Sequence, residues 1–130
     1  MARRFKVLDI ATGQESWLDA EVVITSYLIE QTLTDAATVT YDAAGGVNAK
    51  WTIGGDRTLS IPTNVAAGQS GRVVITQDGT GGRTLTLASG WNLATGNIAS
   101  VAAMTSGQIC VLSWSAITTT TFISTLIFIP

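Results

Sequence analysis

Few residues in this chain could take part in acid–base or nucleophilic catalysis. The chain has no histidine, and its only lysines are Lys6 and Lys50. Serine and threonine are abundant, but a hydroxyl nucleophile needs a neighbouring base to accept its proton, and histidine is the usual one. Neither lysine lies in a recognisable motif. We therefore predict no catalytic residues and expect that the protein is not an enzyme.

Metal and cofactor sites are not predicted either. With no histidine and with Cys110 as the only cysteine, the chain offers no cysteine-based zinc site and no intrachain disulfide. The loop Asp78-Gly79-Thr80-Gly81-Gly82 has too few carboxylates for a calcium site. Its glycines resemble a phosphate-binding loop, but that motif continues as Gly-Lys-Ser/Thr into a helix, whereas Arg83 begins a strand pattern. We expect no bound metal ion and no cofactor.

Carboxylates and tryptophans are the groups that would act on or bind carbohydrate. Paired carboxylates hydrolyse glycosides, but each candidate aspartate lies in a turn context, where aspartate commonly bonds its own backbone; these residues are Asp35, Asp42, Asp56 and Asp78. Trp51 and Trp114 fall on inward-facing strand positions, so we expect them in the core. Trp17 and Trp91 lie beside turns, and they are the candidates for a surface that stacks on sugars.

The composition excludes several further classes of protein. Of 130 residues, 12% are charged and 46% are hydrophobic, and the formal net charge is −2; the mean hydropathy is +0.37. Disorder needs low hydrophobicity or high net charge, and nucleic-acid binding needs a basic footprint. The apolar run from Phe5 to Ile10 is interrupted by Lys6 and Asp9, so it is not a signal sequence, and no apolar run approaches the ~20 residues of a membrane helix. We expect no nucleic-acid and no membrane partner.

The elements that would carry any site are β-strands. Short alternating segments separated by glycine-rich turns are typical of a sandwich or barrel, and the expected strands are Arg4–Asp9, Glu15–Leu18, Ala37–Tyr41, Lys50–Ile53, Arg57–Ile61, Arg72–Gln77, Arg83–Ala88, Gln108–Ser115 and Phe122–Ile129. We predict an all-β fold, a single-domain β-sandwich or jelly-roll-like barrel. Residues 1–20 would form an N-terminal arm or first hairpin, and residues 21–130 the sandwich.

Two segments allow more than one interpretation. Asp19 would cap a helix that places Val22, Val23 and Tyr27 on one face, but the β-branched run at 22–25 favours extended structure, which we prefer. The run from Gly54 to Ile61 also resembles the run from Gly81 to Leu87, each being a glycine turn, an arginine and an alternating Thr/Leu strand. Two copies are fewer than the three expected of a solenoid. We interpret them as one hairpin design used twice, with Asp78–Gly82 as a hairpin turn.

The last two expected strands are apolar on both faces, which is typical of strands covered on both sides. No Asp, Glu, Lys or Arg occurs from Thr84 to Pro130, and interface cores are depleted in charge. In a small single domain the second cover can come from another subunit. Cys110 is expected as a small buried hydrophobe on the inward face. The candidate subunit interface comprises Ile109, Val111, Ile123, Ile127 and Ile129.

From about residue 49 onward the sequence resembles a β-structured module of tailed-bacteriophage virion proteins. The resemblance rests on W-T-I (51–53), D-R-T-L (56–59), P-T-N (62–64), G-Q-S-G (68–71) and Q-D-G-T-G-G-R-T-L (77–85). The segment from Arg3 to Ala20 is more loosely similar to the starts of phage fibre proteins. Members of this family are β-structured and often trimeric, and they occur in fibres, tail tips and head decoration. The resemblance implies no catalytic residues.

The resemblance implies a structural protein of the virion, made in the host cytoplasm. The small size favours a capsid decoration (cement) protein that stabilises the head at capsomer junctions, as a homotrimer in contact with the major capsid protein. The alternative is a small tail or fibre protein that attaches to the host, with surface glycans as a ligand. Arg3, Arg4 and Lys6 are basic against an acidic remainder. They are either a capsid-contacting arm or a solvated terminus.

Overall fold

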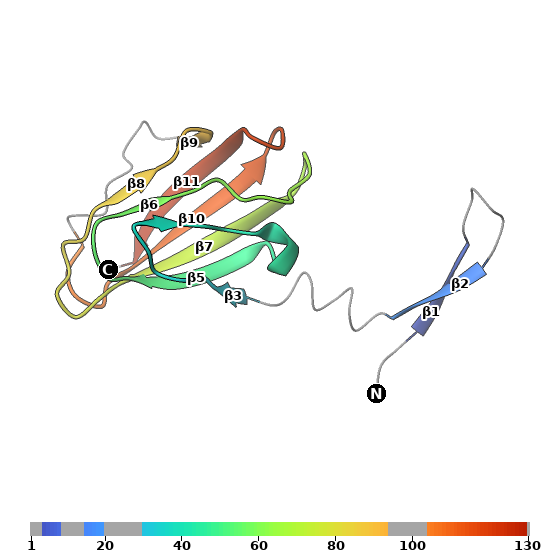
Figure 1. Ribbon diagram of the computed structural model, residues 1–130, viewed down its shortest axis with the longest axis horizontal. Helices are drawn as coiled ribbons and strands as arrows, with labels where there is room; N and C mark the ends of the chain where they lie inside the picture. The colour runs from blue at the N-terminus through green and yellow to red at the C-terminus, as the bar shows by residue number, and fades with distance from the viewer. Residues whose placement is uncertain (1–3, 9–14, 20–29, 94–103, 130) are drawn as a thin grey trace.

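The protein is built almost entirely of β-strands, as the sequence predicts. The computed structural model describes residues 4–8, 15–19, 30–93 and 104–129. Apart from one 3-10 turn, η1 (Ala43–Gly45), its regular elements are strands (Figure 1): β1 (Arg4–Leu8), β2 (Glu15–Asp19), β3 (Glu30–Thr32), β4 (Thr38–Val39), β5 (Asn48–Ile53), β6 (Arg57–Leu59), β7 (Ser70–Gln77), β8 (Leu85–Leu87), β9 (Trp91–Leu93), β10 (Ile109–Ala116) and β11 (Phe122–Ile129). No helix in these ranges is long and apolar enough to span a membrane.

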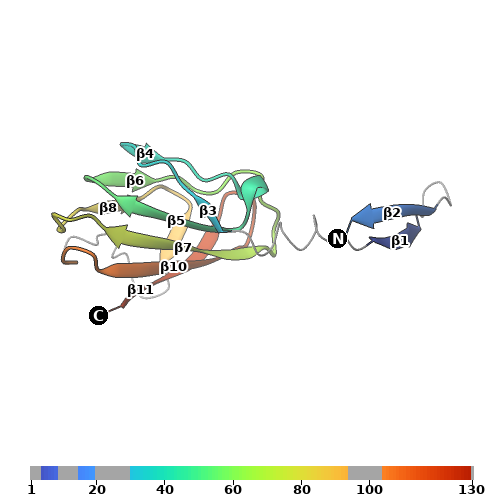
Figure 2. The same cartoon turned by 90° about the horizontal axis from the view of Figure 1, so that it is seen from below.

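Two sheets form the main body of the molecule. The larger has six strands in the order β3-β5-β7-β10-β11-β9, and the smaller has three in the order β4-β6-β8. Strand β10 is antiparallel to β7 and to β11, whereas every other pair in these two sheets is parallel. Figure 2 shows β5, β7, β10 and β11 side by side.

The parallel pairing arises because the chain passes repeatedly from one sheet to the other. Strands β3, β5 and β7 lie in the six-stranded sheet, and β4, β6 and β8, which follow them in sequence, lie in the three-stranded sheet. We call each successive pair a coil. The coils stack in register, with Trp51 of β5 opposite Ile75 of β7 and Leu59 of β6 opposite Leu87 of β8.

The coils correct one interpretation of the sequence. The two similar runs at 54–61 and 81–87 are not two hairpins, because they supply β6 and β8, which are parallel neighbours in one sheet. The glycine-rich segment Asp78–Gly82 is likewise not a hairpin turn, since β7 and β8 belong to different sheets. The resemblance between the two runs reflects equivalent corners of successive coils.

The core lies between the two sheets, and the alternation in the sequence predicts most of it. Val39, Tyr41, Trp51, Ile53, Leu59, Val73, Ile75, Leu85, Cys110, Leu112 and Trp114 are buried on expected inward positions. Trp91 corrects a prediction, because it is buried rather than available to a sugar. Its Nε1 donates a hydrogen bond to the Leu59 carbonyl oxygen at 3.2 Å, and its ring centroid lies 5.3 Å from that of Phe122.

Strand β11 occupies an interior position in the six-stranded sheet over part of its length. It pairs along its full length with β10, and its first residues pair in parallel with β9, a short strand that the sequence did not predict. The Asn92 side-chain nitrogen donates to the Phe122 carbonyl oxygen at 3.2 Å, and the Ser124 hydroxyl donates to the Asn92 carbonyl oxygen at 3.0 Å. These contacts hold the start of β11 against β9.

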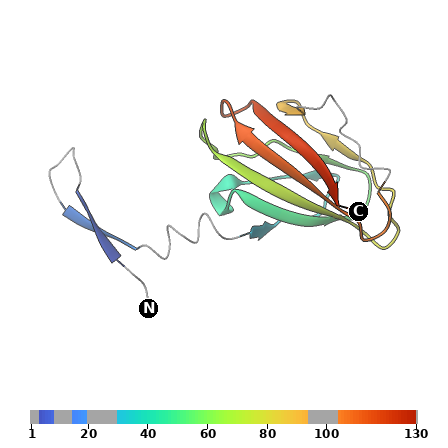
Figure 3. The ribbon, with the colours of Figure 1, turned by 180° about the vertical axis from the view of Figure 1, so that it is seen from behind.

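The N-terminal strands β1 and β2 form an antiparallel pair, as expected. The pair is a two-stranded sheet of its own and joins neither larger sheet; it lies to one side of them in Figures 1 and 3. The ambiguous segment falls mostly at residues 20–29, which lie outside the described residues. Its final part is extended, because β3 begins at Glu30.

Candidate functional site

The candidate site is the outer face of the six-stranded sheet, the side turned away from the core. Figure 3 shows β7, β10 and β11 from this side. Along β7, β10 and the first part of β11, alternation buries one set of residues and leaves the next set outward. The structure places all five predicted interface residues on this face: Ile109 and Val111 from β10, and Ile123, Ile127 and Ile129 from β11.

Four of these residues and one from β7 form a continuous apolar patch. Ile109 pairs with Ile129 across the two strands, and Val111 pairs with Ile127 on one side and with Val74 on the other. Ile127 is 56% exposed and Ile129 46% exposed. We call Val74, Ile109, Val111, Ile127 and Ile129 the apolar patch. Contiguous exposed apolar surface of this kind marks an interaction site more often than scattered residues do.

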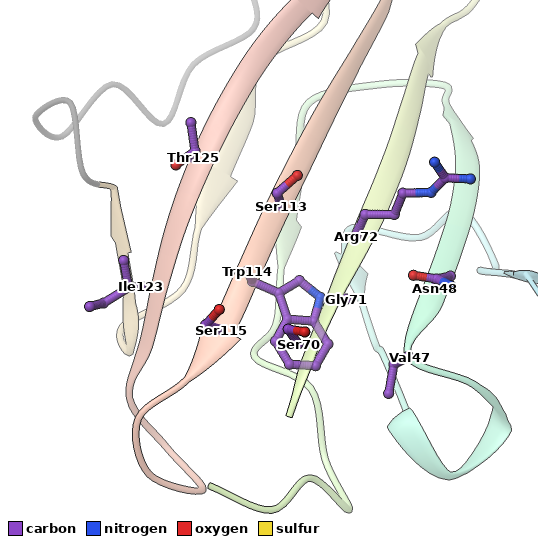
Figure 4. Close-up of a pocket in the computed structure, with 10 residues that line it drawn as sticks. All are labelled: Val47, Asn48, Ser70, Gly71, Arg72, Ser113, Trp114, Ser115, Ile123 and Thr125. Atoms are coloured by element: carbon purple, nitrogen blue, oxygen red, sulfur yellow. The ribbon is translucent and has the colours of Figure 1, made fainter. Parts of the chain in front are cut away.

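Ile123 lies away from this patch, toward the other end of the strands, where the face is hollowed. It is opposite Ser115 of β10 and Asn92 of β9 in the register. The hollow has a volume of about 580 Å³ and is drawn in Figure 4. It is lined by Val47, Asn48, Ser70, Gly71, Arg72, Ser113, Trp114, Ser115, Ile123 and Thr125. The outer face thus has an apolar end and a hydroxyl-rich end.

Gly71 and Trp114 both line the hollow, and they pack closely because glycine has no side chain. A methyl group on Gly71 would lie 2.8 Å from Cζ2 of Trp114 and would overlap the Val47 carbonyl oxygen. That carbonyl also accepts the hydroxyl hydrogen of Tyr41. Trp114 itself is 3% exposed, with its ring edge-on to Tyr41 and Phe122. It is therefore a core residue, as predicted, and offers no open ring face for stacking.

The charges of the outer face are grouped on β3, β5 and β7, on the side of the apolar patch away from β11, and Lys50 is the register partner of Val74. Glu30 of β3 lies 3.7 Å from the Lys50 ammonium of β5 and 3.6 Å from the Arg72 guanidinium of β7. These are loose, exposed ion pairs, which contribute little to stability. Glu30, Lys50 and Arg72 together therefore carry a net charge of +1. The apolar patch contains no charged residue.

The four aspartates that are candidates for carbohydrate chemistry lie at the corners between coils. Asp42 accepts a hydrogen bond from the Ala44 amide at 2.9 Å, and Asp78 accepts from the amides of Thr80 and Gly81 at 3.0 and 2.9 Å. These two confirm the prediction of aspartates that bond their own turns. Asp56 instead reaches the next coil and accepts from the Thr84 amide at 2.9 Å.

Arginine partners hold two of these carboxylates in the charged form. Asp35 lies 2.9 Å from Nη2 of Arg57, and Asp78 lies 2.9 Å from Nη2 of Arg83. The Arg57 hydrogen bond is the main reason that the pKa of Asp35 is below its usual value, and the Arg83 hydrogen bond does the same for the pKa of Asp78. A carboxyl that is paired in this way is a poor general acid. Among the described residues, no three potential metal ligands gather in one place.

Two further groups are made unreactive by burial. Burial raises the pKa of the Cys110 thiol to about 12 and that of the Tyr41 hydroxyl to about 12. The reactive form of cysteine is the thiolate. Cys110 is therefore an unreactive thiol at neutral pH. Its burial in the core confirms the prediction.

Several residues of interest from the sequence cannot be placed in the site. Arg3 lies outside the described residues. Arg4 and Lys6 lie in β1 and Trp17 in β2, and the description covers only their backbone. Conversely, the hydroxyls of the hollow were not foreseen. The signal for Ser113 and Ser115 was present, because they alternate with the inward residues of β10.

Comparison with known proteins adds no relative to these observations. No protein-family model, no curated protein and no solved structure matches this chain.

Proposed function

We propose that this protein is a structural component of a tailed-bacteriophage virion. Specifically, we propose a small capsid decoration protein that stabilises the head by packing at capsomer junctions in contact with the major capsid protein. The sequence resemblance described above supports the class. The observation that carries the proposal is the apolar patch, because an uncharged surface exposed on one chain suits a protein that works by packing against others.

The patch also supports self-association of the chain, and the resemblance to often trimeric phage proteins makes a homotrimer the form that we propose. Its residues are contributed by three adjacent strands that pair in register, so the surface is continuous. Without a cover, an apolar strand such as β11 is an aggregation hazard. A second copy of the chain meets no like charge there, since the patch is uncharged. We therefore assign Ile109, Val111, Ile127 and Ile129 to contacts between subunits.

We further propose that the fold is a β-sandwich wound from parallel coils and not a jelly roll. Two sheets with the core between them favour a sandwich. Jelly rolls consist of antiparallel Greek keys, whereas the pairs from β3 to β8 are parallel. The antiparallel strands β10 and β11 then continue the six-stranded sheet beyond the third coil.

The proposal is tested by adding the protein back to capsids. Expanded capsids that lack the protein should lose resistance to heat, and addition of the purified chain should restore it. A variant with a charge in the apolar patch, Ile127→Glu, should restore less than Ile117→Glu, because Ile117 is similarly exposed but lies in the turn between β10 and β11. Absence of rebinding by the unmodified chain would reject the decoration role.

The hollow supports the alternative, a small tail or fibre protein that binds host surface glycans. Hydroxyls from Ser70, Ser113, Ser115 and Thr125 and the guanidinium of Arg72 surround it, and such groups hydrogen-bond to sugars. Under this alternative the purified protein adsorbs to host cells and competes with infection. Failure to compete at saturating protein would exclude host attachment.

A further inference from the structure

Two sets of apolar positions lie on different parts of the chain. One is the apolar patch. The other is a face of the N-terminal hairpin: the register pairs Phe5 with Leu18 and Val7 with Ser16, so these positions share one face of the pleat. Lys6 opposite Trp17 and Arg4 opposite Asp19 share the other face.

A two-stranded hairpin of this size is not stable by itself. An isolated pair of strands is marginal in water, and a third strand or a packing surface is needed for stability. In the single chain β1 and β2 pair only with each other and join neither larger sheet. The hairpin therefore needs a surface on which its apolar face can pack.

We propose that the hairpin of each subunit packs on the apolar patch of a second copy of the chain. This inference rests on the proposed function, since it takes the patch to be a contact between subunits. Phe5, Val7 and Leu18 would lie against Val74, Ile109, Val111, Ile127 and Ile129, as two sheets packed face to face. The sheets would then be about 10 Å apart.

Three observations favour a second copy over the chain's own patch. The hairpin of a single chain does not pack there. The segment 20–29 joins the hairpin to β3, and β5 and β7, which carry Lys50 and Arg72, lie between β3 and the two strands that carry most of the patch, β10 and β11. Each copy would also be both donor and acceptor, and head-to-tail contacts of this kind form a ring, such as a trimer, when the rotation between copies closes. The segment spans at most about 35 Å when extended, which limits exchange to an adjacent copy.

This arrangement also determines which face of the hairpin, the one with Arg4 and Lys6, is left exposed. When the face with Phe5 and Leu18 packs on the neighbouring subunit, the positions Arg4 and Lys6 fall on the opposite face of the hairpin. They would then be turned outward, toward an acidic capsid surface. The two roles suggested for the N-terminus, subunit contact and capsid contact, are compatible because they use opposite faces.

Disulfide trapping between separately prepared variants tests the proposal. Val7→Cys and Ile127→Cys chains are refolded together under mild oxidation, and the linked peptides are identified by mass spectrometry after non-reducing electrophoresis. Only a contact between chains can join these two cysteines. Cys110 does not interfere, because it is fully buried and its thiol has a pKa of about 12. Docked cysteines have an effective concentration in the millimolar range, so linkage should be on the order of a hundredfold faster than between dissociated micromolar chains.

The controls separate the possible outcomes. Lys6→Cys replaces Val7→Cys on the opposite face of the hairpin and should link poorly to Ile127→Cys. Equal linkage by both variants, or no linkage by Val7→Cys, overturns the proposal. A chain that carries both Val7→Cys and Ile127→Cys is also oxidised at high dilution, and rapid formation of a linked monomer would show that the hairpin packs on its own chain, which likewise overturns it.

Light scattering on Ile127→Glu distinguishes failure of the inference from failure of the proposed function. If Ile127→Glu dissociates the oligomer but the trapping fails, the patch is a subunit contact and only the hairpin assignment is wrong. If Ile127→Glu leaves the oligomer intact, the patch is not the subunit contact, and both assignments fall.

Discussion

Single polar side chains determine how the chain turns from one sheet to the other. Gln77 is the clearest case, since it is 1% exposed and yet polar. Its Nε2 donates to the Arg83 carbonyl oxygen at 3.0 Å, and its Oε1 accepts from the Arg83 amide at 3.1 Å. The Gln77 side chain therefore satisfies both backbone polar groups of Arg83, as a neighbouring strand would do in a sheet. Asp78 and Arg83 close the same corner with an ion pair.

Replacement of this glutamine should destabilise the fold. Gln77→Leu leaves the amide and carbonyl of the partly buried Arg83 without their partner, and an unsatisfied group costs up to about 1–3 kcal/mol as its burial increases. We expect a loss of about 1–3 kcal/mol in the free energy of unfolding, measured by chemical denaturation. Gln108→Leu is the matched control, because Gln108 is only half-buried and accepts one hydrogen bond from Thr105. An equal loss in both variants would contradict this role of Gln77.

The paired aspartates should make stability depend on acid. The pKa values of Asp35 and Asp78 are lowered in the folded protein, by Arg57 and Arg83 first. Their contribution to stability is therefore complete above the unfolded-state value of about 3.9 and is lost as the pH falls through the lower folded-state values. Asp78→Asn should have a lower Tm than the unmodified chain at pH 7, and the two should converge near about pH 2. A constant difference at all pH values would refute this assignment.

Strands could be predicted from the sequence, but the pairing of strands could not. Alternation such as that of Val73 and Ile75 identifies a strand with one inward face, and the inward residues of β5, β7 and β10 were predicted correctly. Parallel pairing joins residues distant in sequence, as Arg57 and Leu85 are joined in β6 and β8. No local pattern specifies such pairing, and glycine-rich corners resemble hairpin turns. Strand β9 was missed because three residues are too few to display alternation.

Close packing between β5, β7 and β10 depends on one glycine. A methyl group at Gly71 would overlap the Val47 carbonyl oxygen and crowd Trp114, and overpacking of this kind costs typically about 1–3 kcal/mol. We expect Gly71→Ala to lower the free energy of unfolding by that amount. Gly79→Ala is the control, because no atom lies within 4 Å of the position of its added methyl group, and it should change stability by less than about 0.5 kcal/mol. Denaturant titration of both variants decides, and similar losses would contradict the packing argument.

At the scale of the whole molecule, charge is distributed so that one surface carries none. In the two larger sheets, the paired carboxylates and guanidiniums lie at the corners of the coils or over β3, β5 and β7. The sequence located the uncharged region, because residues 84–130 lack Asp, Glu, Lys and Arg. It could not show that Val74 of β7 completes the patch, since that depends on the pairing of β7 with β10. It also could not show the hollow, whose lining comes from strands far apart in sequence.

The location of the uncharged surface leads to a prediction about assembly. Ile127 and Ile117 are 56% and 53% exposed, so a glutamate at either position is solvated equally well in a single chain. In an assembly that covers the patch, only Ile127→Glu buries an unpaired charge. Such burial costs about 3 kcal/mol or more, which weakens association about a hundredfold. Light scattering over a range of concentrations should find Ile127→Glu dissociated where Ile117→Glu is assembled, with equal circular dichroism and Tm for the monomers. Dissociation of both variants, or of neither, would place the subunit contact elsewhere on the molecule.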